Sequence, residues 1–138
     1  MIVIACVDDN NGMLFHNRRQ SRDSLLYEHI LHLTQGKKLF LNDYSAKQFL
    51  KLQTENIVVQ NDFLDVASEQ DYCFVENQDI SQKQYDIEKI ILYRWNRVYP
   101  ADYYFHFPEY GKEWKLQQVN EIRGNSHDVI TEEVYTNE

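Results

Sequence analysis

Three arginines, Arg18, Arg19 and Arg22, lie within five residues of one another. Guanidinium groups bind carboxylates and phosphates through paired, charge-assisted hydrogen bonds, so this cluster could hold an anion. The same residues would also suit a solvated basic loop without a ligand. Such a loop would offset part of the chain's formal net charge of −8. Both interpretations stay open, and the second requires no ligand.

Histidines offer two further candidate sites. His29 and His32 are three residues apart in a stretch with helical spacing and could share a metal ion, but no third ligand is evident nearby. His127 stands beside Asp128, a pair suited to acid–base chemistry, yet it lies just before a predicted terminal strand. The chain also contains no HExxH, GxSxG or Walker motif. We therefore expect structural histidines, no metal site and no familiar hydrolase motif.

Composition indicates one folded domain over residues 1–138. Hydrophobic residues make up 43% of the chain, with ten Tyr and seven Phe, so it can bury a continuous core. The net charge of −8 would repel a phosphate backbone, which weighs against nucleic acid as a partner. The apolar run Ile2–Val7 is too short for a signal peptide or a membrane span of about 20 residues. A cytoplasmic protein without a membrane partner is the expectation.

Short apolar runs alternate with helix-like patterns, which favours an α/β sheet. Asp23 is a good N-cap residue, with Leu26, Ile30 and Leu33 following at helical spacing until Gly36. Ser45 is expected to cap a second helix that buries Phe49 and Leu50, and residues 80–87 to form a weaker one. Strands are predicted at residues 2–7, 38–41, 57–60, 72–75 and 90–95, followed by a hairpin of the segment from 114 with residues 129–135.

Several collinear segments resemble dihydrofolate reductase. They are Ile4-Ala5-Cys6-Val7-Asp8 followed by Gly12, Glu88-Lys89-Ile90-Ile91-Leu92, Ala101-Asp102 with Phe105, Phe107-Pro108-Glu109-Tyr110, Trp114, and Asn125-Ser126-His127. The second segment is similar to the family's "EKLYL" strand, and the next two to its "GDTHFPDY" segment. The chain would be a shortened, diverged member, with length missing mainly before Tyr72. The resemblance implies a mixed, mostly parallel central sheet flanked by helices, with a C-terminal antiparallel hairpin.

On the substrate side, the resemblance matches Asp23 to the carboxylate that binds the pterin ring and supports its protonation. A carboxylate in an apolar cleft can have a raised pKa and exchange protons near neutrality. Tyr27 matches the aromatic residue that packs against folate, and Tyr93 replaces a substrate-side threonine. Arg19 and Arg22 fall in the loop that closes over the substrate. Asp23 also has a purely structural explanation, because an N-cap stabilises a helix without any catalysis.

On the cofactor side, the family's "GRxT" turn corresponds to Asn42-Asp43-Tyr44-Ser45. Ser45 is retained, but Asp43 stands where an arginine would grip a phosphate. The family's Gly-Gly pair becomes Glu76-Asn77, which adds bulk and a second carboxylate. Each like charge near a pyrophosphate costs on the order of 1 kcal/mol, and the lost arginine contact about 1.5–3 kcal/mol. We therefore expect no NADPH cofactor.

Three functions stay open. The first is a pseudoenzyme with a degenerate NADPH site that retains a cleft for a small ligand or a partner. The second is an active NADPH-dependent reductase of folate or a pterin-like substrate. The third is an RNA-interacting protein that uses the Arg18–Arg22 loop. The sequence leans against reductase activity, and the aromatic stretch 93–107 allows a homodimer.

Overall fold

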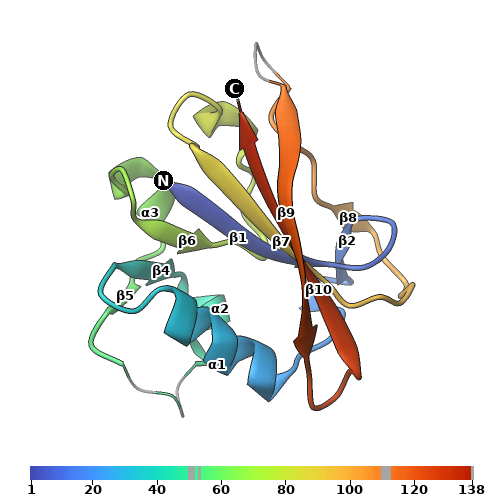
Figure 1. The fold of residues 1–138 in the computed structure, drawn as a ribbon. Helices are drawn as coiled ribbons and strands as arrows, with labels where there is room; N and C mark the ends of the chain where they lie inside the picture. Colours follow the sequence, from blue (N-terminus) through green and yellow to red (C-terminus); the bar gives the residue numbers. More distant parts are fainter. Residues whose placement is uncertain (50–51, 53, 110–112, 138) are drawn as a thin grey trace.

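We analysed a computed structural model of the chain, which describes residues 1–138 except 50, 51, 53, 110–112 and 138. Its main sheet has seven strands in the order β5-β4-β6-β1-β7-β10-β9 (Figure 1). Their bounds are β1 Ile2–Val7, β4 Leu39–Leu41, β5 Ile57–Val59, β6 Tyr72–Phe74, β7 Lys89–Arg94, β9 Trp114–Arg123 and β10 Val129–Asn137. The pairs from β5 to β7 are parallel, whereas β10 is antiparallel to both β7 and β9. This is the mixed, mostly parallel sheet with a C-terminal hairpin that the sequence predicts.

A smaller sheet, in the order β3-β2-β8, lies beyond the end of β1. Its strands are β2 Gly12–Phe15, β3 Arg18–Arg19 and β8 Tyr103–Tyr104. The first arginines of the basic cluster therefore belong to a short strand paired with β2, and the chain then runs directly into the first helix.

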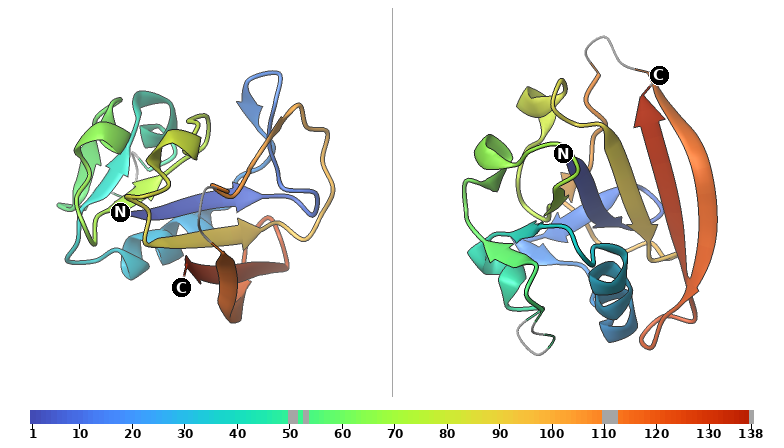
Figure 2. Two further views of the ribbon diagram at one scale, coloured as in Figure 1. Left: turned by 90° about the horizontal axis from the view of Figure 1, so that it is seen from above. Right: turned by 60° about the vertical axis from the view of Figure 1, so that its left-hand side comes forward.

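Both faces of the main sheet are covered, which explains why β1 is apolar along its whole length. Alternate residues of β1 enter different cores, with Ile2 and Ile4 in one and Val3 and Ala5 in the other. Helix α1, Ser24–Leu33, packs in the first core, and helix α3, Phe63–Val66, contributes Phe63 to the second. Figure 2 shows the two helices on opposite sides of the sheet.

Asp23 caps α1 as predicted, since its carboxylate accepts hydrogen bonds from the backbone N–H groups of Leu25 and Leu26. Thr34 is the C-cap, and Gly36 follows with a φ of 82°, in the left-handed region that glycine tolerates. No helix in the described ranges is long and apolar enough to cross a membrane.

Two helix predictions are wrong in detail. Helix α2 spans only Asp43–Ala46, and its N-cap is Asn42, whose side chain accepts from the Ser45 N–H at 2.8 Å. Ser45 thus lies inside the helix, and Phe49 is buried beyond its end, while Leu50 lies outside the described residues. Only a single 3-10 turn, Ser81–Lys83, forms within residues 80–87.

Candidate functional site

The carboxyl ends of parallel strands β4, β6 and β1 meet at one edge of the main sheet, where open α/β sheets usually bind ligands. Residues predicted for the cofactor side gather there. The Ser45 hydroxyl donates to Oε1 of Glu76 at 2.8 Å, and the Asn42 amide donates to Oδ1 of Asn77 at 2.9 Å. The structure therefore joins Ser45 and Glu76 directly, with Asn77 next to them.

Glu76 is also the partner of Arg19, which was predicted for the substrate side. Nε of Arg19 lies 2.9 Å from Oε2, and Nη2 lies 3.0 Å from Oε1, a two-pronged ion pair between largely buried side chains. The Arg19 guanidinium also stacks over the Tyr44 ring, 4.3 Å from its centroid. Burial disfavours the Arg19 charge, but the Glu76 carboxylate outweighs this and raises the pKa of Arg19.

This ion pair changes the electrostatic argument against a bound phosphate. Glu76 does not stand as an isolated negative charge, because Arg19 offsets it. Phosphate binding is hindered for another reason: both carboxylate oxygens of Glu76, and Nε and Nη2 of Arg19, already take part in internal hydrogen bonds. A phosphate at this position would have to displace one of these partners. The residues present therefore do not fit a pyrophosphate without rearrangement.

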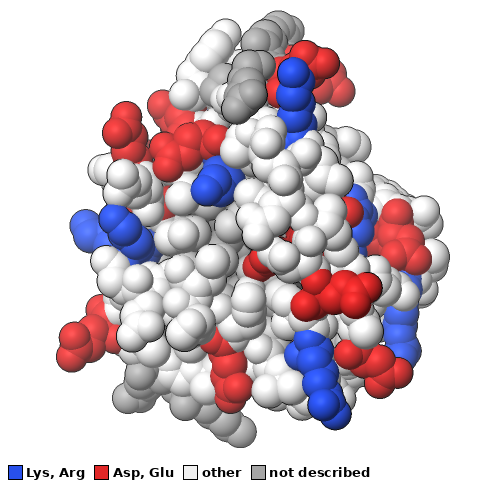
Figure 3. Space-filling view, in the orientation of Figure 1, with Lys and Arg blue, Asp and Glu red and all other residues white. Residues whose placement is uncertain are grey.

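Two other predicted residues, Asp43 and Arg22, lie exposed at the surface. The Asp43 carboxylate accepts from the side chain of Asn61 at 2.9 Å. Within the described part of the chain, the Arg22 guanidinium has no hydrogen-bond or ion-pair partner. On the face drawn in Figure 3, basic and acidic side chains are interspersed.

Tyr27 is buried, with its ring 5.0 Å from that of Phe49 and 6.5 Å from that of Phe74. It borders a cavity of only about 10 Å³, lined also by Cys6, Met13 and Trp95 among others. A cavity of this size holds one water molecule at most. The space beside Tyr27 is therefore filled largely by the protein's own side chains.

Asp23 is buried and accepts more hydrogen bonds than a helix cap requires. Besides the two N–H groups of α1, its carboxylate accepts from the backbone N–H groups of Asn125, Ser126 and His127, at 2.8–3.1 Å. Burial raises the pKa of Asp23, but these bonds and the His127 ring lower it more, so the net pKa falls below its usual value. This is opposite to the raised pKa expected from the sequence, because backbone donors rather than apolar atoms surround the carboxylate.

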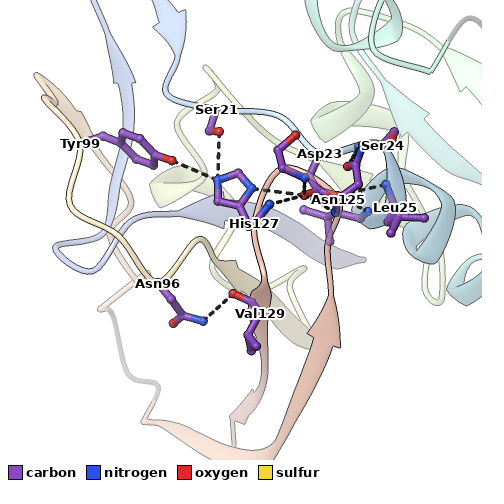
Figure 4. A network of polar contacts seen from close by, with 11 residues as sticks. Ser21, Asp23, Ser24, Leu25, Asn96, Tyr99, Asn125, His127 and Val129 are labelled. Atoms are coloured by element: carbon purple, nitrogen blue, oxygen red, sulfur yellow. Dashed lines mark hydrogen bonds and ion pairs between the residues drawn. The ribbon is translucent and has the colours of Figure 1, made fainter.

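His127, expected to be structural, lies at the centre of a polar cluster with Asp23, Ser21 and Tyr99 (Figure 4). Its Nδ1 lies 3.2 Å from Oδ2 of Asp23, and its Nε2 lies 3.1 Å from the Ser21 hydroxyl and 3.0 Å from that of Tyr99. Trp95 stacks on the ring, with centroids 4.5 Å apart. Sequence analysis missed this cluster because Ser21 and His127 are 106 positions apart and neither lies in a recognised motif.

Tyr93 is fully buried, and its hydroxyl donates to Oε2 of Glu132 at 2.8 Å. The ring of His29 and the amide of Asn120 also bond the Glu132 carboxylate, at 2.8 and 2.9 Å. The His29 contact, helped by the other two against burial, lowers the pKa of Glu132 to about 2. Tyr93 and His29 are thus committed to an internal network, and no group of three metal-ligating side chains occurs among the described residues.

A hollow of about 300 Å³ lies beside the filled cavity, and Met13 borders both. Its wall includes two exposed carboxylates, Asp79 and Asp102, the exposed His106, and aromatic side chains such as Tyr103. Hydrogen bonds from the backbone and side chain of Ser81 lower the pKa of Asp79, which stays ionised. A hollow of this volume is at the lower end of the range for small-molecule sites.

Comparison with known proteins gives a likeness of fold. No protein-family model matches the sequence, and no curated protein sequence is similar to it. Among solved structures, dihydrofolate reductase from Enterococcus faecalis, complexed with NADP(H) and RAB-propyl, is similar with a TM-score of 0.67. The match covers 99% of this chain and 95% of that one at 9% sequence identity. The chain therefore has a dihydrofolate reductase-like α/β fold.

Proposed function

We propose that this dihydrofolate reductase-like protein does not use NADPH and instead binds a small neutral or cationic ligand at the same end of its sheet. The proposal that NADPH is not used is supported by one observation: Arg19 and Ser45 both donate hydrogen bonds to the Glu76 carboxylate. In the family, the loops that correspond to the segments of Ser45 and Glu76 grip the phosphates of NADPH. Here their polar groups bind one another, and exposed Asp43 replaces the phosphate-binding arginine.

The proposal of a small neutral or cationic ligand is supported by the hollow lined by Asp79 and Asp102. Two carboxylates in a concave wall repel anionic ligands and attract cations. Tyr103 and its aromatic neighbours provide faces for ring stacking and cation–π contact. An aromatic amine fits this chemistry better than a dinucleotide or a folate, which both carry several negative charges.

An active reductase is the alternative, and one observation favours it: the similar enterococcal enzyme was solved with NADP(H). Reductase activity would require the Glu76–Arg19 pair to open and the cavity beside Tyr27 to expand when the ligands bind. The RNA-binding alternative retains only Arg18 and Arg22, because Arg19 is paired internally.

Ligand-observed NMR with matched small aromatic amines and aromatic carboxylates tests the proposed pocket. The amines are expected to bind the wild type, and the carboxylates are not. Asp79→Asn with Asp102→Asn keeps the side-chain shape and removes the charge, so amine affinity should fall about tenfold or more. Glu28→Gln, on the exposed side of α1, is the matched control and should change nothing. Preference for carboxylates, or equal binding by the double variant, would contradict the proposal.

A further inference from the structure

Ser21, His127 and Asp23 form a connected row of side chains (Figure 4). The Ser21 hydroxyl lies 3.1 Å from Nε2 of His127, and Nδ1 of the same ring lies 3.2 Å from Oδ2 of Asp23. Nδ1 of the imidazole thus meets a carboxylate, and Nε2 meets a hydroxyl. This order of hydroxyl, imidazole and buried carboxylate is the arrangement that activates a serine for nucleophilic attack.

The surroundings determine which ring nitrogen carries the proton. Asp23 accepts backbone hydrogen bonds from both α1 and the 125–127 turn, which favours its ionised form. An ionised carboxylate only accepts hydrogen bonds, so Nδ1 of His127 must be the donor. In the neutral ring, Nε2 then has a free lone pair, which can accept from the Ser21 hydroxyl or from that of Tyr99. This is the tautomer that a general base for serine requires.

The imidazole is also held in place by packing. Trp95 stacks on it at an interplanar angle of 25°, and His127 is almost fully buried. Gly124 allows the 125–127 turn to approach Asp23, because a Cβ at this position would lie 2.5 Å from Oδ2. The base and its orienting carboxylate are therefore rigidly positioned before any substrate binds.

Tyr99 is a second hydroxyl at Nε2, 3.0 Å away. One lone pair accepts one good hydrogen bond at a time, so Tyr99 and Ser21 compete for it. Removal of the Tyr99 hydroxyl should therefore leave Nε2 entirely to Ser21. This competition provides a test that a purely structural role for the cluster would not predict.

Access and charge stabilisation depend on the segment that carries Ser21. Ser21 is half-buried and lines the small cavity beside Tyr27, so an ester reaches its hydroxyl only when that cavity opens. Within the described chain, the backbone N–H groups of Ser21 and Arg22 donate to no other group. Free N–H groups on a nucleophile and its next residue can stabilise the oxyanion of acyl transfer. The Arg22 guanidinium adds a positive charge for an anionic substituent.

We infer that Ser21 is a nucleophile toward small carboxylic esters, with His127 as its general base and Asp23 as a positioning residue. The Ser21 oxygen attacks the ester carbonyl carbon while its proton passes to Nε2 of His127. The carbon–alkoxide bond breaks, and the alcohol leaves with that proton. Water then attacks the acyl-serine, giving its proton to Nε2, and the carboxylic acid is released as Ser21 regains a proton. This inference does not depend on the proposed ligand pocket or on NADPH.

The first test uses diisopropyl fluorophosphate and maps the labelled peptide by mass spectrometry. The wild type should gain one diisopropylphosphoryl group on Ser21, with loss of fluoride, and should hydrolyse p-nitrophenyl acetate. Ser21→Ala should lose both reactions by about 100-fold or more. Ser68→Ala, an exposed serine outside the cluster, is the control and should retain both. A wild type without label, or a label on another residue, would overturn the inference.

Two further variants separate chemistry from structure. Tyr99→Phe should label at least as fast as the wild type, and slower labelling of a folded variant would contradict the competition at Nε2. Asp23→Asn loses part of its cap, so its labelling rate is corrected for the folded fraction measured by near-ultraviolet circular dichroism. A rate that still falls supports the positioning role, whereas an unchanged rate removes Asp23 from the site. If Ser21→Ala does not fold, the peptide map of the wild type decides the question.

Discussion

The Glu76 carboxylate accepts two hydrogen bonds from Arg19, at 2.9 and 3.0 Å, although 57 positions separate them in the chain. A two-pronged pair of this kind between largely buried side chains ties strand β3 to the segment that follows β6. Ser45 adds a third bond to the same carboxylate. The three side chains therefore join strand β3, helix α2 and the segment that follows β6.

Removal of Glu76 should destabilise the fold, because Arg19 would keep its charge in a largely buried position without a partner. We expect Glu76→Ala to lower the free energy of unfolding by about 2–3 kcal/mol. The double variant Arg19→Met, Glu76→Met should lose clearly less than the sum of the two single changes. Urea denaturation of the wild type, Arg19→Met, Glu76→Met and the double variant measures the coupling, and additive losses would show that the pair is not coupled.

Gly124 should be irreplaceable for a steric reason. An added Cβ would lie 2.5 Å from both the Asp23 carboxylate and the His127 carbonyl oxygen, so the turn would have to move. We expect Gly124→Ala to cost about 2 kcal/mol or more. Gly36→Ala is the matched control, since its Cβ would meet nothing and its φ of 82° alone should cost about 1 kcal/mol. Equal urea midpoints for the two variants would refute the close packing at Gly124.

Glu132 should make the free energy of unfolding depend on pH in the acidic range. Its pKa in the folded protein is about 2, below the ordinary value of 4.5, because His29 and two further donors bond its charged form. Its contribution is therefore complete above about pH 4.5 and is lost as the pH falls through about 2. It amounts to at most about 3.5 kcal/mol, since each pKa unit corresponds to about 1.4 kcal/mol. Glu132→Gln should lose this component, so that the stability gap between wild type and variant narrows in acid. A constant gap from neutral pH to pH 2 would be inconsistent with the lowered pKa.

Much of the fold could be predicted from local patterns. Strands β1 and β7 are almost continuously apolar because both faces of the sheet are covered, and the terminal hairpin follows from its pattern. The start of α2 could not be predicted as safely, because Asn42 and Ser45 are both capping residues. The backbone at the end of β4 decides in favour of Asn42.

The site was harder to predict, because its contacts join distant parts of the chain. Sequence alone identified Arg19, Glu76, Asp23 and Ser45 as candidates but gave no means of knowing that Arg19 pairs with Glu76. The protonation behaviour of Asp23 likewise depends on N–H groups from residues 125–127, about a hundred positions away. Pairings of this kind are set by tertiary structure, so local spacing does not reveal them.

The most direct test of the central claim is thermal denaturation with NADPH, NADH, dihydrofolate and methotrexate, each at saturating or millimolar concentration. A ligand that binds only the folded state at a hundred times its dissociation constant stabilises it by about 2.7 kcal/mol. For a domain of this size, that amounts to a shift of several degrees in Tm. We predict no shift with NADPH or NADH, because Glu76, Arg19 and Ser45 are already bonded to one another. A shift of several degrees with NADPH would contradict this account and favour an active reductase.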